Sequence, residues 1–209
     1  GFVHTPANDI AALESTVKAN KVAAIMIECI QGEGGVLALD EDFVKAVADI
    51  CSKEDILLIV DEVQTGNGRT GRLYSYEYYR IKPDVVTTAK GLGGGLPIGA
   101  CLCNDKLGGV MTPSTHGTTF GANPVVCAGA NYVIDTVSKE DFLDEVEAKG
   151  AYLEGLLREL PEVKNVRRMG LMVGIEIDGD AHDVAAKCVE NGLLIITAKN
   201  LLRMLPPLI

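Results

Sequence analysis

Glu28, Asp61 and Lys90 each follow directly on a short run of mostly apolar, often β-branched residues. Such runs are typical of buried strands. In open α/β sheets, ligands bind beyond the carboxyl ends of the strands. A charged group beside a low-dielectric core either changes its protonation or finds a partner. Two carboxylates and a lysine on one rim are therefore a candidate catalytic site, and the alternative is three unrelated strand-end charges that face solvent.

A lysine at the end of a buried strand suits Schiff-base chemistry. Partial burial of Lys90 is expected to favour the neutral amine, which is the nucleophile. Asp61 suits pairing with a pyridinium nitrogen, because an ionised carboxylate keeps that nitrogen protonated and makes the ring an electron sink. For Lys90 taken alone, the alternative is a surface lysine in a loop.

Glycine-rich stretches follow all three of these predicted strands, at 31–35, 65–71 and 91–95. Glycine allows a backbone to approach a ligand closely and to adopt positive φ. A nucleotide-binding module is the alternative, but no G-x-x-x-x-G-K-[ST] motif is present, and Lys90 precedes its glycines instead of following them. These departures disfavour nucleotide binding.

The first part of the chain alternates apolar runs with helical patterns. We predict strands and helices at these positions: strands 22–28, 56–60, 85–89 and 98–103, a helix after the N-cap Asp40 over 43–51, and a short helix over 74–80. Strand, helix and strand at this spacing predict right-handed crossovers and a mostly parallel α/β sheet buried on both faces.

From Asn123 onward the pattern changes. We predict helices over 124–137, 141–160 and 181–190, and strands over 169–177, 193–197 and 201–205. This order is typical of part of a smaller α+β domain. We therefore divide the chain into residues 1–137 as part of a large domain and residues 138–209 as part of a smaller C-terminal domain.

Composition excludes several classes of function. Hydrophobic residues make up 47% and charged residues 23%, and 19 Lys and Arg against 29 Asp and Glu give a net charge of −10. Such an acidic chain is unsuited to nucleic acids and to anionic membranes. No apolar run approaches the roughly 20 residues of a transmembrane helix. Six scattered cysteines favour a reducing compartment, so we expect a cytoplasmic protein.

No metal site is expected. His4, His116 and His182 lie far apart in the sequence and form no ligand motif. No C-x-x-C pair is present, and Cys101 and Cys103 are expected to point to opposite sides of their strand.

Four motifs, in order along the chain, resemble the class III (subgroup II) pyridoxal-phosphate aminotransferases. They are E-x-x-Q-G-E-G-G at 28–35, I-V-D-E-V-Q-T-G-x-G-R-T-G at 59–71, T-A-K-G-L-G-G-G-L-P-I-G-A at 88–100 and H-G-T-T-F-G-x-N-P at 116–124. The resemblance covers essentially the whole chain. It implies fold type I: a mostly parallel sheet with helices on both faces, plus part of a smaller α+β C-terminal domain.

The same resemblance implies the cofactor pyridoxal 5′-phosphate and a set of residues that hold it. Lys90 would form the Schiff base with the cofactor and later move the substrate proton. Asp61 would pair with the ring nitrogen, with Glu62 beside it. Val63 would pack against one face of the ring, and Gln64 would hydrogen-bond near its phenolic oxygen.

It also implies a substrate site and a homodimer. Thr119 would bind the cofactor phosphate of the neighbouring subunit, with Thr118 close to the substrate, so the active sites would be shared. Glu33 would mask Arg203 while the ω-amine of the donor reacts, and would then release it to bind the α-carboxylate of 2-oxoglutarate or glutamate. The partners would be small amino and 2-oxo acids.

Within the class, the chain is most similar to the acetylornithine aminotransferases. The similarity rests on G-L-G-G-G-L-P-I-G-A at 91–100, P-A-N-D at 6–9 and L-R-M-L-P-P-L at 202–208. It implies transfer of an amino group from N-acetylornithine to 2-oxoglutarate, giving N-acetylglutamate semialdehyde and glutamate in arginine biosynthesis. Ornithine, succinylornithine and 4-aminobutyrate are the alternative donors.

The motifs of the family's N-terminal half, including its phosphate-binding loop, have no counterpart in these residues. We expect a fragment that also lacks the extreme C-terminus and binds the cofactor weakly by itself. A non-catalytic fragment or dimerisation module is the alternative from another class. A Schiff-base enzyme without a cofactor is disfavoured, because Asp61 and Gln64 would have no ring to hold.

Overall fold

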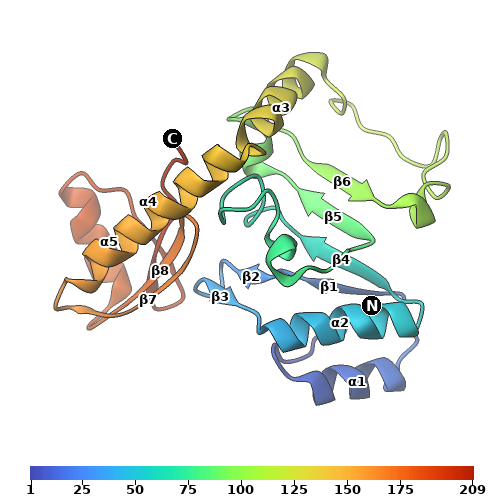
Figure 1. Ribbon diagram of the computed structural model, residues 1–209, viewed down its shortest axis with the longest axis horizontal. Coiled ribbons are helices and arrows are strands. Elements are labelled where there is room, and N and C mark those ends of the chain that lie inside the picture. Colours follow the sequence, from blue (N-terminus) through green and yellow to red (C-terminus); the bar gives the residue numbers. More distant parts are fainter. The chain divides into compact units, whose positions relative to one another are not determined.

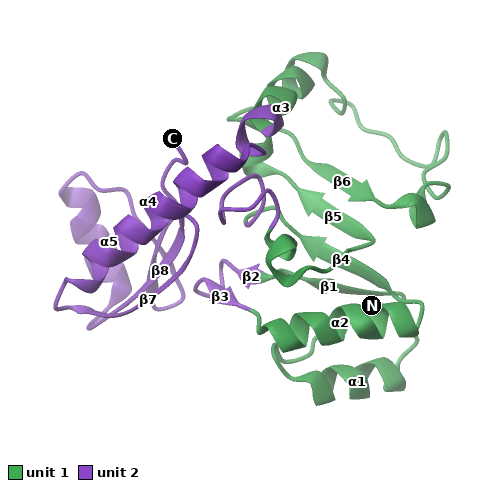
Figure 2. Ribbon diagram, in the orientation of Figure 1, with its two compact units in different colours: residues 1–29, 39–64, 75–133 green, residues 30–38, 65–74, 134–209 purple.

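The computed structural model describes residues 1–209, which fall into two compact units (Figure 2). Unit 1 comprises residues 1–29, 39–64 and 75–133, and unit 2 comprises residues 30–38, 65–74 and 134–209. Both units are discontinuous in sequence, because two short segments between the strands of unit 1 belong to unit 2. A domain boundary between residues 137 and 138 stays a prediction.

Unit 1 is built on a four-stranded sheet (Figure 1). Its strands are β1 (Ala24–Ile27), β4 (Leu57–Asp61), β5 (Val85–Thr88) and β6 (Ala100–Cys103), in the order β1-β4-β5-β6. The first three are parallel, and β6 runs antiparallel to β5. The expected mostly parallel α/β sheet is therefore confirmed, with one antiparallel edge strand.

Two helices of unit 1 form successive layers beside this sheet. Helix α2 (Glu41–Lys53) packs on β1 and β4, and α1 (Ile10–Ala19) packs on α2. Acidic residues in the first turn of α2 and a lysine in its last turn suit the helix dipole. Helix α1 was not predicted, although the Asp9 carboxylate caps it by accepting from the Ala12 amide at 2.9 Å.

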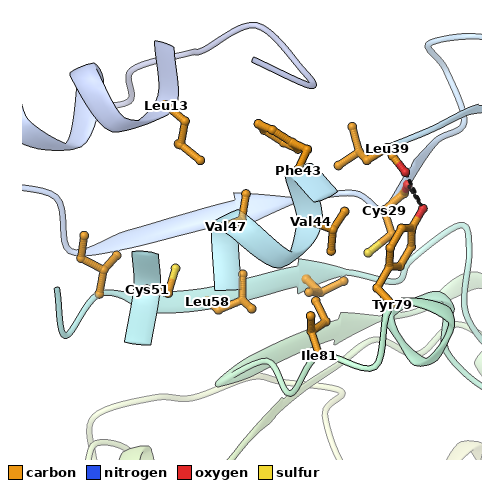
Figure 3. Packing of buried hydrophobic residues seen from close by; sticks show 12 residues of the cluster. Leu13, Cys29, Leu39, Phe43, Val44, Val47, Cys51, Leu58, Tyr79 and Ile81 are labelled. Atoms are coloured by element: carbon orange, nitrogen blue, oxygen red, sulfur yellow. Dashed lines mark hydrogen bonds between the residues drawn. The ribbon is translucent and has the colours of Figure 1, made fainter. Parts of the chain in front are cut away.

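The core of unit 1 lies between α2 and the sheet (Figure 3). Val44 and Val47 of α2 are fully buried, three residues apart on one helix face. The buried Tyr79 lies at the edge of this core, and its hydroxyl donates to the Leu39 carbonyl at 2.9 Å. Burial raises the pKa of Tyr79 above its usual range, so the phenol remains a donor.

Strand β4 is not buried on both faces, which corrects the sequence prediction. Leu58 and Val60 are buried against the helices, whereas Ile59 and Asp61 on the opposite face are only half-buried. On that face Met26 of β1, which pairs with Ile59, is 53% exposed. Within these residues α1 and α2 therefore cover one face of the sheet.

Cys101 and Cys103 of β6 lie on the same face, so the expectation that they point to opposite sides was wrong. Residues two apart along a strand share a face, and the two cysteines pair with Thr87 and Val85, which are also two apart. Both thiols are free and exposed.

Unit 2 is built on an antiparallel sheet. Its strands are β7 (Val163–Met169), β8 (Met172–Ile177), β10 (Leu201–Met204) and β9 (Ile196–Ala198), in that order across the sheet. The remaining elements are helices α4 (Glu140–Arg158) and α5 (Ala181–Glu190) and a small hairpin of β2 (Ile30–Gln31) and β3 (Leu37–Ala38). Helix α3 (Pro124–Val137) begins in unit 1 and ends in unit 2.

Strand β7 was missed by the sequence prediction, which began a single strand at Met169. The chain instead makes a hairpin here, and Gly170 takes positive φ (+54°) between β7 and β8. The charged residues Lys164, Arg167 and Arg168 interrupt the apolar pattern of β7, and each forms an ion pair.

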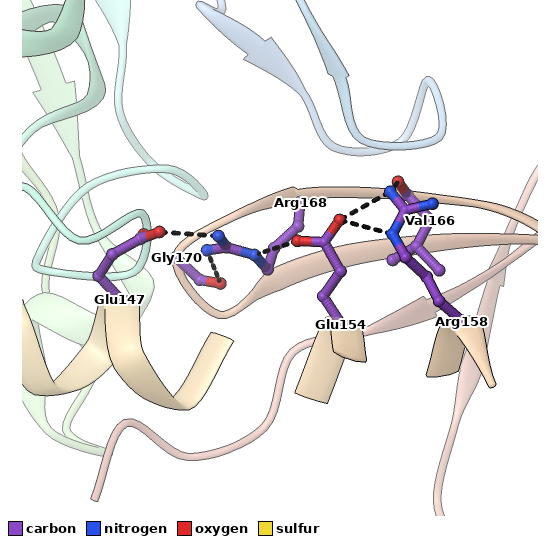
Figure 4. Close-up of polar contacts among 6 residues, drawn as sticks. All are labelled: Glu147, Glu154, Arg158, Val166, Arg168 and Gly170. Carbon is purple, nitrogen blue, oxygen red and sulfur yellow. Dashed lines mark hydrogen bonds and ion pairs between the residues drawn. The ribbon is translucent and has the colours of Figure 1, made fainter. Parts of the chain in front are cut away.

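Ion pairs fasten α4 to β7 (Figure 4). Arg168 of β7 donates to Glu147 at 2.7 Å and to Glu154 at 2.9 Å. Arg158 also donates to Glu154 and reaches the Val166 carbonyl at 2.9 Å. The bond to Glu147 is the main cause of a raised pKa for Arg168, and the bond from Arg168 is the main cause of a lowered pKa for Glu154.

No helix in the structure has both the length and the apolar character needed to cross a bilayer.

Candidate active site

The parallel register of unit 1 brings the three predicted strand-end groups to one edge of the sheet. Ile27 pairs with Val60, so Glu28 follows at the level of Asp61. Asp61 in turn pairs with Thr87 of β5, three residues before Lys90. The carboxyl ends of parallel strands meet at the same edge, which is where ligands bind in open α/β sheets.

Asp61 is half-buried, and a local turn holds its carboxylate. Its Oδ1 accepts from the Val63 amide at 2.9 Å, a turn that aspartate side chains commonly form. No other hydrogen bond of the chain reaches this carboxylate, so its second oxygen remains available to a ligand. Val63 and Gln64, which follow in the same turn, are both half-buried.

Glu62 is fully buried and supports this turn from below the surface. Its carboxylate accepts from the Ser75 hydroxyl at 2.7 Å and from the Tyr76 amide at 3.0 Å. Its own amide donates to the Thr87 carbonyl at 2.8 Å. Burial, and then the nearby charge of Glu62, raise the pKa of the Cys29 thiol to about 12. The geometry favours a supporting role for Glu62, and its contact with a cofactor stays a prediction.

Thr87 is a candidate site residue that sequence reasoning missed. Its Oγ1 is buried and has no hydrogen-bond partner in the structure. A buried hydroxyl without a partner costs about 1–3 kcal/mol. Because Thr87 pairs with Asp61 across β4 and β5, the two side chains share the open face of the sheet. Strand register was the signal that could have found it.

Lys90 begins the short 3₁₀ helix η2 (Lys90–Gly93), and its side chain is exposed. The expected partial burial of its amine is therefore not found in this chain. Its φ of +48° lies in the left-handed region, where a non-glycine residue stores about 1–2 kcal/mol of strain. Such strain clusters at functional sites. The glycines that follow are also needed, since a Cβ at Gly94 (φ +58°) would lie 2.9 Å from a methyl carbon of Val133.

Thr118 and Thr119 lie in the segment between β6 and α3, and both are exposed. Within this segment only Asp105–Leu107 forms a short 3₁₀ helix, η3. The contacts expected of the two threonines with phosphate and substrate stay predictions.

Unit 2 brings Glu33 and Arg203 together. An oxygen of Glu33 lies 2.7 Å from Nη1 of Arg203, although the residues are far apart in sequence. The Arg203 side chain is only 6% exposed, whereas Glu33 is 75% exposed. Glu33 sits in the turn of the β2–β3 hairpin, which is closed by a bond from the Gly35 amide to the Gly32 carbonyl at 3.1 Å. A nearly buried cation thus meets a carboxylate that solvent can also reach.

Solved structures with the same fold include two groups of aminotransferases. The chain matches acetylornithine aminotransferase from Elizabethkingia anophelis with a TM-score of 0.89 and 37% identity, covering 100% of this chain and 55% of that one. It matches ornithine delta-aminotransferase from Plasmodium falciparum with a TM-score of 0.90 and 35% identity, covering 99% and 56%. These likenesses confirm fold type I.

Curated relatives are more similar in sequence. The acetylornithine aminotransferase of Haemophilus ducreyi is 50% identical over 211 residues, which include all of this chain and 53% of the relative. That of Bacillus subtilis is 45% identical, with 55% of its length covered. The chain thus spans about half the length of the curated relatives it matches. Residues 4–209 match the family model for aminotransferase class-III, and the chain belongs to the class-III aminotransferases.

Proposed function

We propose that this chain is part of an enzyme that transfers an amino group from N-acetylornithine to 2-oxoglutarate in arginine biosynthesis. The observation that carries the proposal is the ion pair of Glu33 with the nearly buried Arg203. A reaction that alternates two substrates needs one pocket to accept two different charge patterns. An arginine that pairs either with a glutamate of the chain or with a substrate carboxylate meets that need.

The aminotransferase class uses pyridoxal phosphate, and the strand-end residues fit its ring. Asp61 offers an oxygen that no group of the chain occupies, and Thr87 offers a buried hydroxyl without a partner. Lys90 offers an exposed amine on a strained turn. Val63 and Gln64 would flank the ring. When bound, this cofactor supplies a carbonyl carbon and an electron-accepting ring.

The chain's own residues supply the positioning and the proton transfer. The Asp61 carboxylate, fixed by the Val63 amide, would hold a proton on the ring nitrogen. Lys90 would hold the cofactor covalently through its side-chain amine. The same amine would serve as the general base that accepts the proton from the substrate Cα.

Arg203 would bind the α-carboxylate of 2-oxoglutarate or glutamate through its planar fork of donors. Glu33 would occupy that fork while N-acetylornithine reacts, and solvent exposure leaves it free to turn away. Breaking a nearly buried ion pair exposes an uncompensated charge, so Glu33 would leave only when a substrate carboxylate replaces it.

We also propose a homodimer with shared active sites, in which Thr119 reaches the cofactor phosphate of the neighbouring subunit and Thr118 lies near the substrate. The exposure of both threonines supports this role, because neither is held inside its own unit. Exposed apolar side chains in the same segment, Met111 (63%) and Phe120 (84%), are typical of a surface that a partner covers.

Mass spectrometry after borohydride reduction tests the cofactor assignment. With pyridoxal phosphate present, a reduced adduct is expected on Lys90 and is lost in Lys90→Ala. Lys199→Ala is the matched control, because Lys199 is also exposed and also has positive φ (+53°). An adduct that persists in Lys90→Ala would overturn the assignment. If the 209 residues alone give no adduct while the protein at its natural length does, the chain is a non-catalytic part of the enzyme.

Substrate competition tests the choice of donor. N-acetylornithine is expected to give the largest kcat/KM among four donors, the others being ornithine, succinylornithine and 4-aminobutyrate. A larger value for ornithine would refute the proposed donor and leave the transaminase assignment intact. Ornithine is the strongest rival, because ornithine aminotransferases are among the solved structures with the same fold.

A further inference from the structure

Arg69 occupies an unusual position for an arginine. It lies in the glycine-rich loop 65–74 of unit 2, and its Nη1 donates to two backbone carbonyls, of Leu171 at 3.0 Å and of Pro206 at 2.6 Å. The Leu171 amide donates back to the Arg69 carbonyl at 3.0 Å. Burial lowers the pKa of Arg69 from its ordinary value, and no carboxylate pairs with it. A partly buried cation is here held by carbonyl oxygens alone.

The Leu171 and Pro206 carbonyls lie where the backbone hydrogen bonds between β8 and β10 end. Met204 pairs with Val173, and continuing this register by two residues places Pro206 opposite Leu171. Proline has no amide hydrogen, so the ladder cannot continue there. Unpaired carbonyls in a covered position cost free energy. Arg69 therefore closes the end of the two-stranded ladder in place of the missing backbone donor.

The loop that carries Arg69 is firmly seated. The Thr70 hydroxyl donates to the Thr65 carbonyl at 3.2 Å, and both side chains are fully buried. A Cβ at Gly170 would lie 2.4 Å from the carbonyl carbon of Thr70 and 2.7 Å from the Gly71 amide nitrogen. The loop and the β7–β8 turn thus contact each other through their backbones. The backbone that carries the Arg69 guanidinium therefore has little freedom to shift.

The strand that Arg69 closes is the strand that carries Arg203. Arg203 precedes Pro206 by three residues and pairs with Gly174. The hairpin with Glu33 rests on the same position, since a Cβ at Gly174 would lie 3.0 Å from the Gly35 carbonyl. A shift of β10 along or away from β8 would therefore move Arg203 relative to Glu33.

We propose that Arg69 is a positioning residue for Arg203: by holding the Leu171 and Pro206 carbonyls, it fixes β10 so that the Arg203 guanidinium meets a substrate carboxylate squarely. The inference rests on the proposed role of Arg203 in carboxylate binding. Bidentate recognition of a carboxylate depends on the alignment of the guanidinium fork. A displacement of about 1 Å at such a site can cost up to about a hundredfold.

The test uses the protein at its natural length and equilibrium binding by calorimetry. The probes are glutarate, which has two carboxylates, and glutaramide, the neutral diamide of the same length. In Arg69→Met, which keeps the length of the side chain and removes its donors, the Kd for glutarate is expected to rise about tenfold, with the Kd for glutaramide nearly unchanged. In Arg69→Lys, whose ammonium still donates to a carbonyl, a smaller rise is expected. The KM for 2-oxoglutarate should follow glutarate, with kcat nearly unchanged.

Arg203→Met separates the two hypotheses. If it leaves glutarate binding intact, the proposed role of Arg203 fails. If it abolishes the preference for glutarate and Arg69→Met does not weaken glutarate binding, only the inference about Arg69 is overturned. Should Arg69→Met fail to fold, Arg69→Lys decides, and glutarate affinity identical to wild type in that variant refutes the inference. A purely structural role would lower the unfolding temperature without changing the ratio of the two Kd values.

Discussion

Gly150 in the middle of α4 provides a test in which helix propensity and packing predict opposite signs. Propensity alone predicts that alanine stabilises an interior helix position by about 1 kcal/mol relative to glycine. In the structure, a Cβ at Gly150 would lie 2.0 Å from the Gly170 carbonyl oxygen and 2.9 Å from Nη1 of Arg168. The carbonyl has nowhere to move, because Gly170 itself packs against the backbone of Thr70. Overpacking of this kind costs about 1–3 kcal/mol or more.

Gly150→Ala is therefore expected to lower the free energy of unfolding by about 2 kcal/mol. Gly155→Ala is the matched control, since Gly155 lies on the same helix with no atom within 4 Å of an added Cβ. That variant should gain about 0.5–1 kcal/mol. Urea unfolding followed by far-ultraviolet circular dichroism measures both changes in free energy. In thermal unfolding followed by the same signal, the midpoint temperatures of the two variants should differ by about 5–10 °C. Equal or greater stability of Gly150→Ala relative to wild type would refute the packing argument.

Three further outcomes are expected. Ser75→Ala removes a 2.7 Å donor from the buried Glu62 carboxylate and should lower unfolding stability by about 1–3 kcal/mol, so an unchanged melting temperature would contradict it. The Cys29 thiol, buried with its pKa raised to about 12, should resist iodoacetamide in the folded protein at about pH 8, while the two exposed cysteines of β6 react; peptide mapping checks this. Glu154 has its pKa lowered by Arg168, so this carboxylate contributes stability above its unfolded value of 4.5 that is lost as the pH falls through the folded pKa. As the pH is lowered, the free energy of unfolding should therefore fall less in Arg168→Met than in wild type. Identical pH profiles would refute the assignment.

Much of the sheet of unit 1 could be predicted from local pattern. The runs that end at Asp61 and before Lys90 form strands because β-branched and other apolar residues pack well on a half-buried pleated surface. The direction of β6 could also have been inferred. The connection from β5 to β6 spans only residues 89–99, and a parallel crossover needs a dozen or more residues, usually with a helix. The strand was predicted, but its reversal was not.

The hairpin of β7 and β8 shows where pattern fails. Arg167 and Arg168 are poor strand formers by composition, and their places in the sheet are stabilised by carboxylates from other elements. The isolated Gly170 within an apolar run was the available signal of a turn. For the candidate site at the strand ends the opposite holds, since the ends of parallel strands align by register and need no long-range contact to be recognised.

Residues that support a site differ from the residues proposed to react there in how far apart in sequence their contacts lie. The Asp61 carboxylate accepts from an amide two residues away, so this contact can be predicted from the local sequence. Ser75 meets Glu62 across 13 residues, and Arg69 reaches Leu171 and Pro206 across 102 and 137 residues. A motif can therefore reveal that Arg69 belongs to a glycine-rich loop but not that it closes a strand ladder. The residues that position a site are the ones for which the folded structure, and variants designed from it, supply information that sequence motifs lack.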